Sequence, residues 1–462
     1  MGRMYDVIVL EPTSSDIGIK TVKHVSALLR KDLRWAVAGQ NGGEMENCVE
    51  GLKGTIKEGD TLPSIEICSG VKEEMQELVK KTKILINVSE VNDGRGEILI
   101  EACAGYGTHY LDTANDIHWL GGMIRKYHDV ARENRAIIMS HISVENTPQD
   151  LLTICAVMQL RTKLNLRTRE IVCSINESSF PPTSTSSSHA LPSPLSATTP
   201  ISAPRSPRHP PLNPWFLSLV RGRTATPGTN RLGLRRELTL GMLAPSHTLA
   251  SQQTRVLVHR GWALQQEGRW YGEGFYYNEY YRVTSSNVGL TGWVKRLRAG
   301  YRKASLVAAD PATPIISLRA IAIADQDGAF PDRALSEFSY HGSAPDLVAA
   351  FLAQGAATIL YTRGLVARVG GGGVLTPAVL GMDFVERLSR VGFVSARAIS
   401  KAFKDPYPAT RRWWHIVRFE PFAPLAGIED PRAAVRKMFV CIFDISDDKL
   451  EGNPVGSFAN LC

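Results

Sequence analysis

The stretch VLEPTSSDIG, residues 9–18, lies between a short apolar run and an amphipathic one. Residues 5–10 (YDVIVL) are an unbroken β-prone run, as expected for a strand that is covered on both faces. Residues 17–30 then place apolar side chains at helical spacing, and residues 34–39 (RWAVAG) give a second β-prone run. This strand–loop–helix–strand order puts residues 9–18 where parallel α/β folds hold the pyrophosphate of a dinucleotide.

The same alternation of strand and helix patterns continues toward residue 140. The expected elements are a helix at 71–82, a strand at 83–89, a helix leading into a strand at 96–112, a helix at 115–135 and a strand at 136–140. Such alternation is typical of a parallel, doubly wound sheet. We therefore predict an α/β fold with an N-terminal Rossmann-like domain over residues 1–140, followed by a second α+β domain with a mixed sheet.

The remainder of the chain is expected to be less regular. Residues 178–214 are rich in Ser, Thr and Pro and contain no acidic residue, so they cannot bury enough apolar surface to fold alone. Strand and helix patterns return at 316–328, 344–364 (a helix and then a strand) and 375–393. The predicted organisation is the start of the second domain at 141–177, a disordered insert at 178–255, a substrate or dimerisation domain at 256–393 and an atypical extension at 394–462.

The composition is that of a globular protein that works in a reducing compartment. Of 462 residues, 44% are hydrophobic and 21% charged, and the seven cysteines include no CxxC pair. An odd number of cysteines argues against a closed disulfide framework, so a cytoplasmic location is expected. The net charge of +8 comes without a dense Lys/Arg block, so no nucleic-acid partner is expected.

No run reaches the ~18–20 apolar residues that a membrane helix needs. Residues 347–361 are apolar enough for peripheral membrane contact to be conceivable, but a buried helix followed by a strand is the favoured interpretation. The aromatic run at 269–281 (RWYGEGFYYNEYY) could line an apolar substrate pocket, although packing in a core is the commoner outcome. GGGG at 370–373 precedes no GK[ST] and is expected to make a tight turn.

Several motifs, in order, resemble the saccharopine dehydrogenase-like oxidoreductases, including trans-acting enoyl reductases. A family pattern close to YDVVVFGPTGYTG corresponds to residues 5–18, ALAGRN to 36–41, LNCVGPYxxYGEPVVEAC to 86–103, GTHYxDxxGE to 107–116, FDSxPSDL to 144–151 and GGxLTPAxxxGxxLxxRLxxxGF to 371–393. The resemblance covers roughly residues 1–160 and 270–393. It implies an NADP- or NAD-dependent enzyme that reduces an activated double bond in a lipid, polyketide or other secondary-metabolite intermediate.

The resemblance also implies a small-molecule or carrier-bound acyl substrate and a possible homodimer. The candidate cofactor-binding residues are Thr13, Ser14, Ser15, Gly18, Gly39, Gln40, Asn87 and Ser89. No catalytic residue is assigned, because the family shows no single motif from which a proton donor could be carried over. No Cys/His metal constellation is visible, so no metal is expected.

This chain departs from the family on the cofactor side. Glu11 and Ser14 stand where the family has glycines, Gln40 replaces an arginine suited to a 2′-phosphate, and Glu90 with Val91 replaces Gly-Pro. Glycines at these positions let backbone N–H groups approach the pyrophosphate. A carboxylate such as that of Glu11 would repel a phosphate. At a distance of 4 Å this repulsion costs about 1 kcal/mol in water and about 4 kcal/mol at an effective dielectric constant of 20.

Two interpretations of the loop follow. Its hydroxyls and Asp16 could simply cap the helix, or the hydroxyls and backbone amides of residues 13–18 could still hold a phosphate, with Glu11 pointing elsewhere. Gly18 lies one residue later than the third glycine of the family. The alternative function is therefore a cofactor-free protein that acts as a non-redox isomerase or cyclase, or as a partner of a biosynthetic enzyme.

Other polar residues have both structural and functional interpretations. Asn87 and Ser89 end a predicted strand and would face the ligand crevice. Asp112 and Asp116 could contact ligand or cap the following helix, and Glu145 and Asp150 at the domain junction are candidates for proton handling. His109 and His118 lack metal-like spacing and are expected to be structural.

Overall fold

The computed structural model describes residues 2–28, 32–53, 61–89, 94–175, 212–218, 220–222, 229, 234–246, 248–265, 271–283, 316–328 and 331–390. These residues all belong to one compact unit, Met1–Phe419. The predicted extension at 394–462 lies outside the described residues, as does the part of the predicted insert between 178 and 211.

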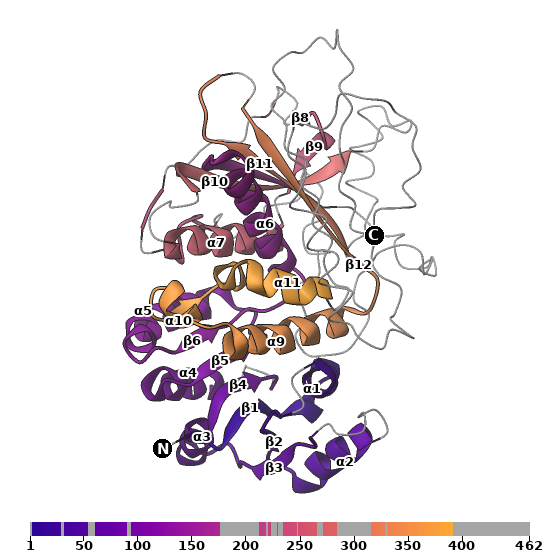
Figure 1. The fold of residues 1–462 in the computed structure, drawn as a ribbon, viewed down its shortest axis with the longest axis vertical. Coiled ribbons are helices and arrows are strands. Elements are labelled where there is room, and N and C mark those ends of the chain that lie inside the picture. Colours follow the sequence, from indigo (N-terminus) through magenta and orange to yellow (C-terminus); the bar gives the residue numbers. More distant parts are fainter. Residues whose placement is uncertain are drawn as a thin grey trace, which may run out of the picture. The chain divides into compact units, whose positions relative to one another are not determined.

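A seven-stranded parallel sheet forms the first layer of the fold (Figure 1). Its strands are β1 (Tyr5–Leu10), β2 (Trp35–Gly39), β3 (Ser64–Ile67), β4 (Thr82–Asn87), β5 (His109–Asp112), β6 (Ile137–Met139) and β13 (Gly373–Leu375). They are ordered β3-β2-β1-β4-β5-β6-β13, and every neighbouring pair is parallel. The order reverses between β1 and β4, so the predicted doubly wound, Rossmann-like sheet is confirmed.

Helices cover both faces of this sheet, as the alternating side chains of β1 require. The helices of this region are α1 (Asp16–Leu28), α2 (Gly42–Lys53), α3 (Lys72–Lys81), α4 (Arg95–Tyr106) and α5 (Ile117–Glu133). Val7 and Val9 join a core that includes Val22 and Val25 of α1. Ile8 and Leu10, on the opposite face, pack into a second core with side chains of α3, α4 and α5.

A second, six-stranded sheet is mixed, as predicted. Its strands are β7 (Thr168–Ile175), β8 (Arg235–Glu237), β9 (Gly241–Pro245), β10 (Tyr271–Val283), β11 (Ile316–Ala324) and β12 (Arg333–Tyr340), in the order β12-β11-β7-β10-β9-β8. Only β7 and β10 pair in parallel. Helices α6 (Thr147–Leu164) and α7 (Leu249–Leu264) pack against it. The aromatic run belongs to its core, since Tyr271, Phe275, Tyr277 and Tyr280 are buried.

The predicted domain boundaries need two corrections. Residues 256–393 are not one separate domain, because β13 adds to the first sheet beside β6 and helix α9 (Ala344–Tyr361) packs against α1, β4 and β5. The predicted insert at 178–255 is too long, because β8, β9 and the start of α7 fall inside it. This part of the chain is folded because Leu240 and Leu243 are buried in a small apolar cluster on the second sheet.

The stretch 344–364 forms a single helix, α9, and not the predicted helix and strand. Residues Leu347–Ile359 of α9 are all buried, and a helix that is apolar all round needs no amphipathic pattern when protein surrounds it. By length and composition α9 could also cross a membrane, but 72% of its apolar window is buried inside the protein. The remaining elements at this end are α10 (Leu365–Arg368) and α11 (Met382–Arg390).

A buried arginine joins α7 to the first sheet. Arg260 is 1% exposed and donates hydrogen bonds to the carbonyl oxygens of Leu217 and Val374. Its Nη2 lies 2.9 Å from Nδ1 of His128, which also accepts from the backbone N–H of Val374 at 3.0 Å. Burial lowers the pKa of His128 to about 4, so the imidazole is a neutral acceptor. The helix is thus anchored to the strand β13.

The GGGG turn before β13 is structural, as expected. All four glycines, 370–373, have positive φ angles between 79° and 119°. A Cβ atom on Gly372 would lie 2.3 Å from the carbonyl oxygen of Ala136, so no side chain fits between this turn and the start of β6.

We predict that Gly372→Ala destabilises the protein by about 1–3 kcal/mol, because the new methyl group meets backbone that cannot move freely. Urea unfolding followed by circular dichroism measures this free energy. Gly122→Ala is the matched control, because Gly122 lies within α5 with no atom within 4 Å of an added Cβ. It should stabilise the protein by roughly 0.5–1 kcal/mol. Equal stability of both variants would contradict this account of the turn.

Candidate functional site

The loop between β1 and α1 lies at the carboxyl edge of the sheet, at the point where the strand order reverses. Glu11 takes the left-handed backbone conformation, with φ 55° and ψ 47°. Residues Pro12–Ser14 form a single 3₁₀ turn, and α1 begins at Asp16. A non-glycine residue in this conformation costs roughly 1–2 kcal/mol. Glu11 therefore keeps the backbone shape that a glycine would adopt there, at an energetic cost.

Gly18 performs the packing role of a third glycine despite its shifted position. A Cβ atom on Gly18 would lie 2.2 Å from the carbonyl oxygen of Pro12, so a larger residue would push the loop off the helix. In dinucleotide-binding loops the third glycine allows this kind of close packing. The extra residue is accommodated by the 3₁₀ turn at Pro12–Ser14.

The hydroxyl groups of the loop bond to protein atoms. Ser15 accepts a hydrogen bond from the N–H of Gly18 at 3.2 Å, so the capping interpretation is confirmed for this residue. Thr13 donates to the carboxylate of Glu44 at 3.0 Å. The Ser14 hydroxyl lies 3.0 Å from the carbonyl oxygen of Val88 and 2.8 Å from that of Glu11. Ser14 thus links the loop to the end of β4.

The Glu11 side chain turns into the space beside β2 and α4. Its Oε2 lies 3.4 Å from the position of a Cβ atom on Gly39, and its Oε1 lies 3.9 Å from Nη1 of Arg95. These two side chains are 16% and 28% exposed, and ion pairs near the surface contribute about 0–1 kcal/mol. The cavity beside them is about 10 Å³, enough for about one water molecule. This cavity is too small for a pyrophosphate with Glu11 in the observed position.

The predicted residues after β2 lie beside this cavity. Gly39 has no room for a side chain, because a Cβ atom would meet the terminal methyl of Met45 at 2.9 Å. Gln40 is exposed, and its Nε2 lies 3.3 Å from the Cβ position of Gly70. Arg95 lies against the same glycine, with Cδ and Nη1 both at 3.4 Å from that position. Glu90 and Val91 lie outside the described residues.

Asn87 and Ser89 are brought together with the loop, but both are buried. The Asn87 side chain donates to the hydroxyl of Tyr110 at 3.0 Å and accepts from the N–H and hydroxyl of Ser89 at 3.1 and 2.6 Å. Asn87 is 0% and Ser89 is 6% exposed. In this conformation they order the carboxyl end of β4, and a ligand would reach Ser89 before Asn87.

Asp112 and Asp116 have different roles. Asp116 accepts from the N–H groups of His118 and Trp119 and so caps α5. Asp112 is fully buried at the end of β5 and accepts from the Ser140 hydroxyl at 2.5 Å and from the N–H of Ala114 at 3.0 Å. Burial raises the pKa of Asp112, although these donors oppose the shift.

His141, which follows Ser140, was not predicted to be special. It is 2% exposed, has a φ of 73°, and its two ring nitrogens have no hydrogen-bond partner of good geometry among the described residues. Burial lowers its pKa to about 4, so the imidazole is neutral. His109 is structural as predicted, since its Nδ1 accepts from the N–H of Ile137 at 2.9 Å.

Asp150 lies at the junction between α6 and the chain before α11. Its Oδ2 accepts from the N–H of Ala378 at 2.8 Å, which caps the 3₁₀ turn Pro377–Leu380. Burial raises its pKa to about 7. Burial also raises the pKa of Glu145, which precedes the same helix. The Asp150 carboxyl can therefore hold a proton near neutral pH, and a role of these two residues in proton handling stays a prediction.

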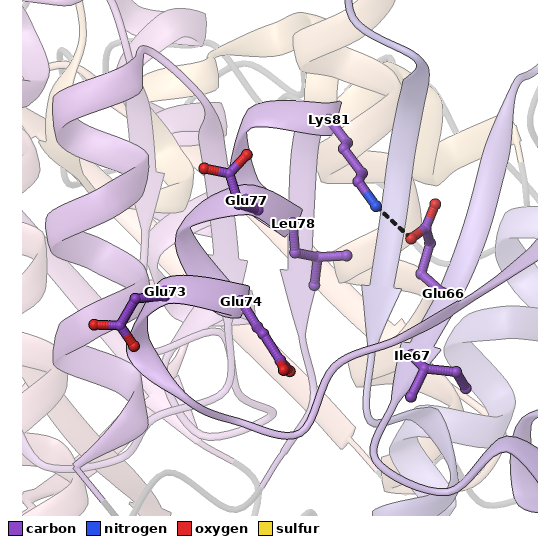
Figure 2. Close-up of a pocket in the computed structure, with 7 residues that line it drawn as sticks. All are labelled: Glu66, Ile67, Glu73, Glu74, Glu77, Leu78 and Lys81. Atoms are coloured by element: carbon purple, nitrogen blue, oxygen red, sulfur yellow. Dashed lines mark hydrogen bonds and ion pairs between the residues drawn. The ribbon is translucent and has the colours of Figure 1, made fainter.

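A larger recess, of about 250 Å³, lies between edge strand β3 and helix α3 (Figure 2). It is lined by Glu66, Ile67, Glu73, Glu74, Glu77, Leu78 and Lys81. Lys81 is paired with Glu66 at 2.7 Å, so the remaining charge of the recess is negative. Such a surface repels phosphate. Within the described residues, no group of three or more His, Cys, Asp or Glu could hold a metal.

Comparison with known proteins gives partial similarities to one group of oxidoreductases. No protein-family profile matches the sequence. The chain is 28% identical over 140 residues to the saccharopine dehydrogenase-like oxidoreductase of Mus musculus, and 29% identical over 138 residues to that of Homo sapiens. Each match covers 29% of this chain and 31% of the relative. The matched region thus spans about a third of the length of the relatives, and it supports the resemblance there.

The chain also resembles solved structures in part of its course, two of which are named as dehydrogenases. Saccharopine dehydrogenase (L-Glu forming) from Saccharomyces cerevisiae has 8% identity and a TM-score of 0.47, and it covers 86% of this chain and 99% of its own. The DAP dehydrogenase of C. glutamicum in complex with DAP has 8% identity and a TM-score of 0.35, with coverages of 84% and 99%.

We predict that Asp150→Asn becomes more stable relative to the wild type as the pH rises from about 4 to 7. The folded-state pKa of about 7 lies above the ordinary 3.8, so the wild type loses stability as this carboxyl ionises on rising pH. The relative gain is about 1.4 kcal/mol per pH unit in this window. Urea unfolding at pH 4.5 and pH 7 measures it, with Asp129→Asn, 70% exposed, as control. If Asp150→Asn and the wild type differ in unfolding free energy by the same amount at both pH values, the raised pKa of Asp150 is contradicted.

Proposed function

We propose that the protein is an NAD(P)H-dependent oxidoreductase that holds its dinucleotide across the switch point between β1 and β4. The observation that carries this proposal is the strand order β3-β2-β1-β4-β5-β6, with a tight loop leading from β1 directly into α1. In open α/β sheets of this order, ligands bind in the crevice at the carboxyl ends of the strands, where the order reverses. The partial similarity to saccharopine dehydrogenase-like oxidoreductases supports it.

The proposed reaction is reduction of an activated double bond. A bound nicotinamide cofactor would supply the hydride. The substrate class, an enoyl group on a small molecule or an acyl carrier in lipid, polyketide or other secondary metabolism, rests on the motif resemblance. A cytoplasmic location, expected from the cysteines, and a homodimer, implied by the resemblance, are also proposals.

The residues of the chain fit a dinucleotide in part. The N-terminus of α1 directs its partial positive charge toward the crevice, and Gly18 holds the loop against the helix. The exposed hydroxyl of Ser14 and the N–H groups at the start of α1 would bind the pyrophosphate. Asn87 and Ser89 would order the edge of β4 beneath it. Glu11 opposes binding until its carboxylate turns away from this space.

A second candidate function is favoured by the small cavity beside Glu11. If Glu11 permanently replaces the phosphate, the protein acts without a redox cofactor, as an isomerase or cyclase or as a partner of another enzyme. The two candidates differ in whether the natural sequence binds a dinucleotide at all.

We predict that calorimetric titration of the wild type detects NADPH or NADH binding below millimolar concentration. Glu11→Gly should tighten binding about tenfold or more, because a like charge near the phosphate costs about 1–4 kcal/mol. Glu133→Gln, at the end of α5, is the control for a lost carboxylate and should leave the affinity unchanged.

The alternative outcomes separate the two candidates. No binding by the wild type, together with binding by a Glu11→Gly, Ser14→Gly double variant, would favour the cofactor-free function. No binding by either protein at millimolar NADPH and NADH would rule out the proposed oxidoreductase.

A further inference from the structure

The residue directly after β2 has neither of the side chains that commonly distinguish NAD from NADP, and the nearby Glu44 carboxylate is bonded to Asn41 and Thr13. A carboxylate at this position binds the ribose 2′-hydroxyl of NAD, and a nearby arginine accommodates the 2′-phosphate of NADP. This chain has the neutral Gln40 there, directly after Gly39. The residue that follows, Asn41, is occupied as the acceptor for the N–H of Gly43 at the start of α2.

An arginine reaches the same place from a distant part of the sequence. Arg95 is the first residue of α4, which follows β4. A Cβ atom added to Gly70 would lie 3.4 Å from Nη1 of Arg95 and 3.3 Å from Nε2 of Gln40. The two side chains thus approach the same point. The guanidinium therefore lies near the side-chain amide of Gln40, which follows β2, and it brings a positive charge that Gln40 lacks.

Glu11 is one partner of Arg95, and its carboxylate is an anion that a phosphate can replace. Glu11 Oε1 lies 3.9 Å from Nη1, which is longer than the ~2.7–2.9 Å of a charge-assisted hydrogen bond. A phosphate carries more charge than a carboxylate and can accept two parallel hydrogen bonds from a guanidinium.

We propose that Arg95 binds the ribose 2′-phosphate of a dinucleotide and makes the site selective for NADPH over NADH, with Glu11 as the carboxylate that the phosphate displaces. This inference rests on the proposed function and names its cofactor. Arg95 acts here as a specificity-determining residue, and no step of the reaction depends on it.

The test is a calorimetric titration of the full-length wild type, Arg95→Gln and Arg95→Lys with NADPH and NADH. Adenosine 2′,5′-bisphosphate and adenosine 5′-monophosphate are titrated as well, because only the first carries the 2′-phosphate. Arg132→Gln, in the last turn of α5, controls for loss of one arginine. Thermal unfolding of each variant verifies that it is folded.

The wild type should bind NADPH at least tenfold more tightly than NADH. Arg95→Gln should remove this preference, by weakening NADPH and the bisphosphate about tenfold and leaving NADH and the monophosphate within twofold. Arg95→Lys should retain part of the preference and Arg132→Gln all of it.

Equal weakening of both dinucleotides by Arg95→Gln would overturn the inference, because Arg95 would then serve the pyrophosphate or the loop. Unchanged NADPH binding would overturn it as well. In both cases the proposed oxidoreductase function would still stand. Binding of neither dinucleotide by the wild type or by Glu11→Gly would overturn the inference together with the proposed function.

Discussion

The contact between the carbonyl oxygen of Pro12 and Gly18 fixes the geometry on which the candidate site depends. Because no side chain at position 18 intervenes, the first turn of α1 lies directly against the loop that leaves β1. The helix N-terminus is thereby held at the carboxyl edge of the sheet, next to the end of β4. The positions of the loop hydroxyls, of Glu11 and of the small cavity all follow from this one close approach.

Glu11 gives the site two properties with one cause. Its backbone adopts the left-handed conformation that glycine adopts most readily. Its side chain places a carboxylate beside the loop, 3.9 Å from Arg95. Under the proposed function, an anion would bind here only in exchange for this carboxylate.

Much of the fold follows from local sequence patterns, and the exceptions have identifiable reasons. Mainly apolar, β-prone runs such as 5–10 and 83–89 predicted the parallel sheet, because strands covered on both faces need no polar alternation. The helix α9 was divided wrongly because the first three residues of its β-prone end ATILY, Ala357–Ile359, are buried among protein, where intrinsic propensity has little weight. The return of β13 to the first sheet is a long-range pairing that local patterns do not contain.

Sequence patterns predicted some residues of the candidate site and missed others. The loop residues and Gly39, Gln40, Asn87 and Ser89 were found from their places after strands, and the structure brings all of them to one edge of the sheet. Arg95 could not be found, because only the folded chain places the start of α4 beside Gly70 and Glu11. His141 was missed for a similar reason, since its burial and its positive φ are set by tertiary packing.

Hydrogen–deuterium exchange of the wild type with and without saturating NADPH tests the central claim most directly. The account predicts slower exchange in peptides that cover residues 11–19 and 94–99, because the ligand orders the loop and the start of α4 together. Unchanged exchange in both segments, or protection confined to the acidic recess between β3 and α3, would contradict it.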